Sequence, residues 1–174
     1  DRAIVVERDA LSYFLPRSAF LASSLASGSI PGWNPAPVLG KPFFADWQSA
    51  ALYPANLLLL VPPLSRGFNL LFVFHYLWAA LGGFAWLRAK GLPRASACLG
   101  AVVWGLGGTL LSLGHLFTLL MAASWLPWVL LAWERPAPVR RRIALAALVL
   151  ALPLLTGAPE VILLISGALL LASR

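Results

Sequence analysis

Polar side chains are scarce in this 174-residue chain, and those able to do chemistry are concentrated before residue 67. Asp9 stands at the start of a stretch with helical spacing, and Tyr13 follows one turn later. Two interpretations of Asp9 are open. Its carboxylate could cap the first turn of the helix, where free backbone N–H groups and the helix dipole favour an acid. It could instead act as a general base, or bind a metal ion, at a membrane surface.

The segment from 28 to 54 alternates turn-forming residues with aromatic and amide side chains. This pattern also has two interpretations. It could be a proline-stiffened loop whose aromatic rings anchor at the membrane interface. It could instead be a carbohydrate-binding surface, on which aromatic faces stack against sugar rings while amides and carboxylates bind the hydroxyls. The candidate binding residues of this segment are Trp33, Asn34, Asp46, Gln48 and Tyr53.

Three further ionisable residues interrupt the apolar half of the chain. His75 lies within a long apolar run, and we expect it to be a packing residue. His115 and Glu160 lie between apolar runs, beside turn-forming residues, and an ionisable group in such a place is a functional candidate. The sequence contains no phosphate-binding loop, zinc-protease motif, catalytic triad spacing or dinucleotide fingerprint.

The composition excludes most soluble folds. Hydrophobic residues make up 60% of the chain, charged residues only 11%, and the mean hydropathy is +0.84. A soluble domain carries about 25% charged residues. The net charge of +7 does not indicate a nucleic-acid partner, because the basic residues separate long apolar runs, as in the loops of a membrane protein. We therefore predict an all-α, polytopic integral membrane protein.

The apolar runs predict how this protein is organised. Residues 1–67 form a large loop, with an amphipathic interfacial helix over 9–27 and a proline-bracketed half-helix within 52–64. Residues 68–174 form the membrane-spanning region. A span needs about 20 residues, so the uncharged stretch around His115 must fold back, and the last two spans are short. The predicted spans are 68–87, 95–114, 116–133, 143–156 and 161–173.

The short loops predict the orientation. The loop from 88 to 94 contains three basic residues and no acid, and the loop from 134 to 142 contains four basic residues and one acid. Both loops are therefore expected on the cytoplasmic side. Residues 1–67, His115 and the turn before Glu160 are then extracytoplasmic.

The order of motifs in the first half resembles the bacterial YfhO-like membrane proteins. The resemblance covers essentially the whole chain and matches the N-terminal portion of a longer family member. Its most specific part is a Gly-x-x-Pro-x-Trp-Asn-Pro block followed by Gln-Ser and Tyr-Pro pairs. The matching segments are 28–35, 40–42, 45–49, 53–54, 114–115 and 125–128, together with Asp9, Tyr13 and Pro16.

This resemblance implies a GT-C-like helical bundle, that is, an integral membrane glycosyltransferase of the bacterial cytoplasmic membrane. Such an enzyme moves a sugar from a polyprenyl-phosphate carrier to an extracytoplasmic envelope glycopolymer or lipid. Asp9 matches the acidic residue near the start of the first large outer loop that is central to catalysis in the superfamily, and a first membrane helix is expected upstream. A divalent cation bound by Asp9 is one alternative for a cofactor. Arg17, Lys41 and Arg66 are candidates for the carrier phosphate, and each of them is more readily explained as an ordinary solvated surface residue.

Two residues depart from the family pattern, since Asp46 and Glu160 stand where amide side chains are more typical. The alternative functions are a transporter or flippase of lipid-linked saccharides and a scaffold for envelope assembly. A transporter is expected to place polar residues near the middle of its spans, whereas here polar residues are concentrated outside them.

Overall fold

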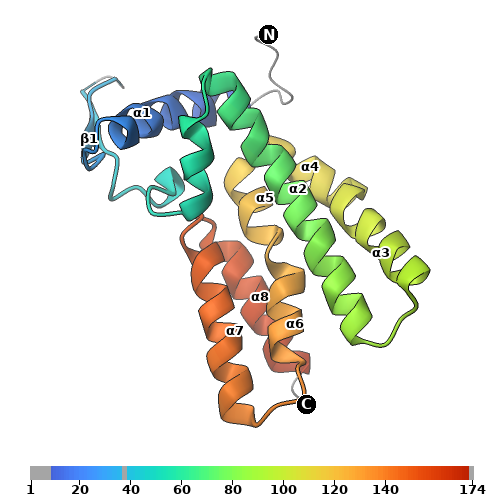
Figure 1. Ribbon diagram of the computed structural model, residues 1–174. Coiled ribbons are helices and arrows are strands. Elements are labelled where there is room, and N and C mark those ends of the chain that lie inside the picture. Colours follow the sequence, from blue (N-terminus) through green and yellow to red (C-terminus); the bar gives the residue numbers. More distant parts are fainter. Residues whose placement is uncertain (1–8, 37–38, 173–174) are drawn as a thin grey trace.

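The computed structural model describes residues 9–36 and 39–172, and these residues are mostly helical (Figure 1). One short antiparallel bridge pairs β1 with β2, so that Trp33 faces Pro42 and Asn34 faces Lys41. The α-helices are α1 (Leu15–Ala26), α2 (Leu64–Ala89), α3 (Arg94–Leu106), α4 (Gly108–Ser112), α5 (Phe117–Ala123), α6 (Leu126–Trp133), α7 (Val139–Leu154) and α8 (Pro159–Ala172). The other elements are a π-helical turn η1 (Ala10–Phe14), the 3-10 helices η2 (Trp47–Ser49), η3 (Pro54–Leu60) and η4 (Leu113–His115), and the strands β1 (Trp33–Asn34) and β2 (Lys41–Pro42).

Among the described residues, two helical stretches are long and apolar enough to cross a membrane. They are α2, with 26 residues, and the segment Arg94–His115, with 22 residues, which joins α3, α4 and η4. They overlap the predicted spans 68–87 and 95–114. At about 1.5 Å per residue these helices reach about 39 and 33 Å, against a hydrocarbon core of about 30 Å. The apolar segment Phe117–Trp133 is shorter, and a break at Ser124 divides it into α5 and α6.

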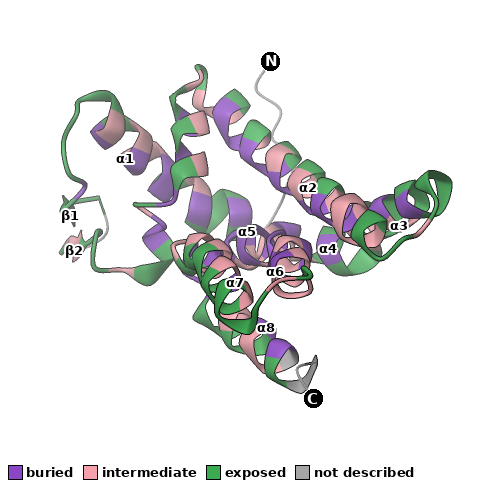
Figure 2. Cartoon of the chain, turned by 60° about the horizontal axis from the view of Figure 1, so that its bottom comes forward, coloured by how far each residue is buried: buried purple, intermediate pink, exposed green. Residues whose placement is uncertain are grey.

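The apolar side chains of these helices point largely outward. Only 33% of the most apolar window of α2 and 28% of that of Arg94–His115 is buried. Figure 2 shows exposed residues along the outward faces of α3 and α7. Water disfavours such a surface, whereas lipid chains suit it. Its largest exposed members on α2 and α3 are Leu70, Val73, Leu77, Leu81, Leu99, Val102, Val103 and Leu106.

The helices run alternately up and down (Figure 1). α2 leads away from α1, α3 and α4 return beside it, α5 and α6 lead away again, and α7 and α8 form a last hairpin. The connections after α2 and α6, which contain the basic loops, therefore lie at the end opposite α1. The reversal predicted around His115 occurs there. An extended Gly107 ends α3 and interrupts the helical segment, and the chain turns back after η4.

An aromatic core fixes the loop region onto the helices. The rings of Phe72 and Phe117 lie 4.5 Å apart, and Phe68 packs against both. Phe14, just before α1, packs edge-on against Phe117 at 6.0 Å. The start of α1, the first half of α2 and the start of α5 are thereby held together.

A helix is present over the predicted range 9–27, as η1 and α1. Phe14 and Leu21 of its apolar stripe are buried, whereas Leu11 is exposed. Arg17, Ser18 and Ser24 are buried as well. The following loop supplies a partner for Arg17, the carboxylate of Asp46, so α1 packs partly through a polar contact.

Two prolines shape this region as their chemistry requires. Pro16 lacks a backbone N–H, and the chain passes it through the π-helical turn η1 without ending the helix. The half-helix predicted within 52–64 is the 3-10 helix η3, which begins at Pro54 and packs on α1 and α2. Gly67 permits this packing, because a Cβ atom there would lie 2.6 Å from the carbonyl oxygen of Leu58.

Candidate functional site

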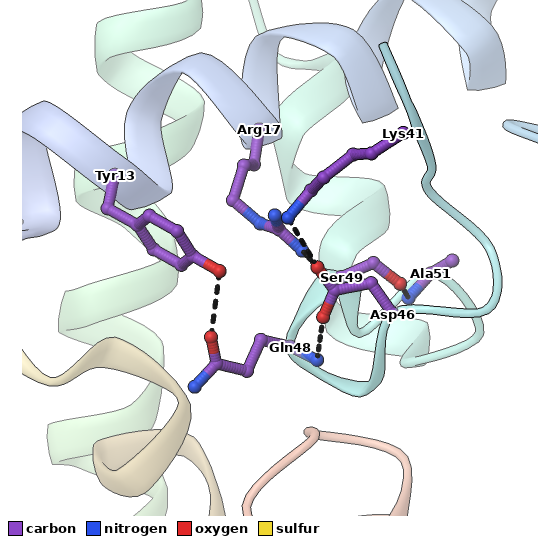
Figure 3. Close-up of polar contacts among 7 residues, drawn as sticks. All are labelled: Tyr13, Arg17, Lys41, Asp46, Gln48, Ser49 and Ala51. Atoms are coloured by element: carbon purple, nitrogen blue, oxygen red, sulfur yellow. Dashed lines mark hydrogen bonds and ion pairs between the residues drawn. The ribbon is translucent and has the colours of Figure 1, made fainter. Parts of the chain in front are cut away.

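A cluster of five polar residues joins α1 to the loop that follows it (Figure 3). Asp46 Oδ2 accepts hydrogen bonds from Arg17 Nη2 at 2.7 Å and from Lys41 Nζ at 2.8 Å. Tyr13 donates its hydroxyl proton to Gln48 Oε1 at 2.8 Å. We call Tyr13, Arg17, Lys41, Asp46 and Gln48 the Asp46 cluster.

Local structure places each member of this cluster. Tyr13 and Arg17 are four residues apart in one helical stretch and therefore share a face. The antiparallel bridge between β1 and β2 positions Lys41. Asp46 is the N-cap of η2, and its Oδ1 accepts the backbone N–H of Gln48 at 3.0 Å.

The Asp46 cluster places the positive charges of Arg17 and Lys41 against the single negative charge of Asp46 in a partly buried place. Burial raises the pKa of the Asp46 carboxyl, but hydrogen bonds from Lys41 and Arg17, the Arg17 charge and the Gln48 N–H outweigh it and lower the pKa below the ordinary value of 3.8. Asp46 is therefore an ionised carboxylate that already has three donors. The guanidinium of Arg17, which is only 8% exposed, also lies 4.8 Å from the centre of the Tyr13 ring.

The Asp46 cluster changes the expected role of two cations. Arg17 and Lys41 were candidates for a carrier phosphate, yet both bind Asp46. Arg17 retains one buried donor, its Nε, without a partner among the described residues. A cavity of about 20 Å³ between Phe14, Arg17, Gln48 and Asn56 has room for one water molecule.

Tyr53 and Asn34, both predicted to bind substrate, are used inside the fold. Tyr53 is 2% exposed, and its hydroxyl accepts a hydrogen bond from Trp125 Nε1 and contacts His75 Nε2, both at 2.9 Å. His75 Nδ1 lies 2.6 Å from the carbonyl oxygen of Leu71. That oxygen can only accept, so Nδ1 carries the proton and the Tyr53 hydroxyl donates to Nε2 of a neutral imidazole.

The same contacts confirm the expectation for His75, which is a packing residue with both ring nitrogens satisfied. Burial raises the pKa of Tyr53 to about 12, so its hydroxyl stays protonated. Asn34 is likewise buried, and its Oδ1 accepts the backbone N–H of Ala36 at 3.0 Å.

The remaining predicted residues lie on the surface or near it. Asp9 is exposed, and its side chain does not cap the helix. Trp33 is 58% exposed, and the neighbouring Trp47, which the prediction did not include, is 65% exposed. His115 is half-buried at the end of η4, and Glu160 is exposed in the first turn of α8.

Contacts between segments gather these residues at one end of the molecule. The Phe14–Phe117 ring contact joins the helix that begins with Asp9 to the turn containing His115. The α7–α8 turn, which precedes Glu160, packs against η2, because Gly157 lies directly against the carbonyl oxygen of Trp47. Figure 3 shows this turn passing beneath Gln48. Four segments distant in sequence therefore contribute to one face.

The site offers no ready cage for a metal ion. Within residues 9–36 and 39–172, no three His, Cys, Asp or Glu side chains come together in a way that could hold one. Asp9 would have to bind a divalent cation with substrate or water oxygens.

The cluster partners of Asp46 were missed by the sequence analysis, and only the four-residue spacing of Tyr13 and Arg17 hinted at them.

The exposed side chains at this end of the molecule allow three kinds of interaction: proton acceptance, stacking and hydrogen bonding. An exposed carboxylate, Asp9, can accept a proton, and the exposed rings of Trp33 and Trp47 can stack on an apolar face of a ligand. His115 and Glu160 carry groups that can form hydrogen bonds. No family model, curated protein or solved structure matches the chain.

Proposed function

We propose that the chain is part of a multi-span membrane glycosyltransferase of the GT-C type. It moves a sugar from a polyprenyl-phosphate-linked donor to an envelope glycopolymer or lipid outside the cytoplasmic membrane. The observation that carries this proposal is the gathering of Asp9, the exposed tryptophans and the turns near His115 and Glu160 at one end of an apolar set of helices. The motif order of the first 54 residues supports it.

The membrane placement draws on two features of the helices. α2 and Arg94–His115 have the length of a span, and their leucines and valines face outward. The basic loops lie at the end opposite α1, which agrees with the distribution of positive charge expected across a bacterial membrane. In this placement, residues 1–67 lie outside the cell membrane together with the proposed site.

Asp9 is the proposed general base. Its carboxylate is exposed and does not cap the helix, so it remains able to accept the proton of an acceptor hydroxyl. Asp46 is a poor candidate for this role, because its oxygens already accept from two cations and a backbone N–H. We assign Asp46 to holding the loop that carries Trp33 and Trp47.

A transporter of lipid-linked sugars has less support. Its substrate path needs polar groups near the middle of the spans. His75, near the middle of α2, already has partners on both ring nitrogens.

The test is an Asp9→Asn variant of the full-length protein in a strain that lacks it, with sugar on the envelope polymers and lipids as the readout. Removing a general base lowers the rate by about 10²–10⁴-fold, so we expect the sugar to disappear at unchanged protein level. Asp9→Glu should restore part of it. Glu7→Gln, which removes the same charge two residues earlier, is the matched control and should leave transfer near normal.

Two results would count against the proposal. Normal sugar in Asp9→Asn would remove Asp9 from the chemistry and favour the transporter or scaffold. Equal loss in Glu7→Gln would show that the charge of the segment, and not the Asp9 carboxylate, is what matters.

A further inference from the structure

At the basic end of the molecule, opposite the proposed catalytic face, side-chain contacts join the ends of α2 and α6. Glu134, just after α6, accepts a hydrogen bond from Trp86 Nε1 at 2.6 Å and forms an ion pair with Lys90 Nζ at 2.8 Å, both at the end of α2. Both contacts are to Oε2 of the carboxylate. Around it the loops 88–94 and 134–142 carry seven basic residues against this one acid.

A cavity of about 330 Å³ opens beside this contact. Lys90, Glu134 and Arg135 supply its polar walls, and Trp86 and Leu131 supply apolar ones. With Glu134 already paired to Lys90, the lining has a net positive charge from Arg135. Among the residues that the structure describes, the exposed Arg135 has no hydrogen bond or ion pair of its own.

An apolar groove of about 200 Å³ continues from this cavity between α6 and α7. Trp128, Ala132, Leu145 and Val149 line it, and Arg135 stands at its mouth. Leu131 and Arg135 belong to both spaces. The groove therefore leads from the charged end of the molecule toward the middle of the helices.

We propose that this cavity and groove bind one anionic phospholipid of the cytoplasmic leaflet. Its phosphate lies at Arg135 and Lys90, and one acyl chain occupies the groove along Leu131, Leu145 and Val149. The proposal rests on the membrane placement given above, but not on glycosyl transfer.

Two features select a phospholipid as the occupant. The order of the spaces, charged at the helix ends and apolar deeper in, is the order of a lipid in its leaflet, and a free phosphate would leave the groove empty. The excess of basic residues favours a headgroup with no compensating cation over a zwitterionic one. The Arg135 guanidinium can bind a phosphate with two parallel hydrogen bonds.

A fixed lipid at this point would bridge α2, α6 and α7. α6 and α7 are short helices, so an acyl chain lying in the groove would fill the space between them. Arg142, in the first turn of α7, places its guanidinium 5.5 Å from the centre of the Trp133 ring on α6, and its buried Nε has no partner among the described residues.

The experiment uses the full-length protein reconstituted in phosphatidylcholine bilayers that contain a minor fraction of phosphatidylglycerol, followed by native mass spectrometry of the extracted protein. We expect phosphatidylglycerol to be retained in preference to phosphatidylcholine. Arg135→Gln should lower that preference by at least about fivefold, the effect of one basic residue on an anionic lipid. Arg141→Gln is the matched control, since Arg141 is exposed in the same loop but lines neither space.

Leu145→Trp tests the groove without changing charge, and we expect it to lower retention as Arg135→Gln does. Equal losses in Arg135→Gln and Arg141→Gln would overturn the proposal, because they indicate general attraction to the basic end. So would unchanged retention in Leu145→Trp, or release of the lipid by excess inorganic phosphate. Sugar transfer measured on the same variants separates this proposal from the previous one, since Asp9→Asn should leave lipid retention intact.

Discussion

Asp46 provides the ionic connection between α1 and the loop that carries the exposed tryptophans. Arg17 of α1 and Lys41 of β2 both form ion pairs with its carboxylate. These ion pairs take the place of the hydrogen bonds that each charged group would form with water. Arg17 is buried, and this carboxylate compensates its positive charge. The Asp46 cluster therefore determines where the loop from 28 to 54 sits relative to Asp9.

Asp46→Asn should destabilise the protein by about 3 kcal/mol, the lower end of the cost of breaking a buried ion pair. The amide removes the negative charge and leaves Arg17 buried without compensation. Chemical unfolding of the detergent-solubilised protein, followed by tryptophan fluorescence, measures the change. Asp9→Asn is the control, because Asp9 is exposed, and it should unfold like the wild type.

The wild type and Asp46→Asn should also differ in how their free energy of unfolding depends on pH. The pKa of Asp46 is lowered in the folded state, so its contribution is complete above the unfolded value of 3.8 and is lost as the pH falls through the lower, folded value. The difference in stability between wild type and Asp46→Asn should therefore be constant near neutral pH and shrink below about pH 4. A difference that persists undiminished in acid would contradict the ionic role.

At the scale of elements, the α7–α8 turn packs against η2 and so helps to hold the loop of the proposed site in position. Gly157 has φ of +81°, and a Cβ atom there would collide with the backbone of Trp47 and Gln48. The turn thus requires glycine for its own conformation and for the approach of η2. Any residue with a side chain would push η2, and with it Asp46, away from the helices.

Gly157→Ala and Gly91→Ala separate these two requirements. Gly91, in the α2–α3 loop, has φ of +85° but open space around its missing Cβ. Alanine at Gly91 should cost only the positive φ, about 1–2 kcal/mol. Alanine at Gly157 should cost clearly more than this and also reduce sugar transfer, as measured by unfolding and by the complementation assay. Equal costs at both positions would show that the turn does not support η2.

The whole molecule has two chemically different ends joined by apolar helices. The loop region, with both acids and cations, covers one end, and the short basic loops form the other. This division makes the orientation of the chain testable independently of any activity.

Labelling of single cysteines in the full-length protein measures that orientation, after the exposed Cys98 has been replaced by serine. A membrane-impermeant thiol reagent added to intact cells should label Ile30→Cys, at an exposed position in the loop region. It should label Val139→Cys, exposed at the start of α7, only after the membrane is opened. The reverse pattern would place the basic loops outside. Ser49, which lies in the same loop region, is too buried to be a good reporter.

The sequence by itself determined the helical character of the chain and the approximate positions of its turns. The length of an apolar run and the presence of Gly, Pro or basic residues at its ends are local properties, and they are read without knowing the path of the chain. For this reason α2 and Arg94–His115 overlap the predicted spans, and the chain folds back near His115 as predicted.

Only the tertiary structure decided which polar residues are consumed inside the fold. Arg17 and Asp46 are 29 residues apart and Tyr53 and Trp125 are 72 apart, so no local pattern relates them. The sequence therefore marked Tyr53 and Asn34 as binding residues, although both are buried and hydrogen-bonded inside the fold. Whether a polar side chain is free or satisfied depends on the partner that the folded chain brings to it, because a buried hydrogen-bonding group is stable only beside a complementary one.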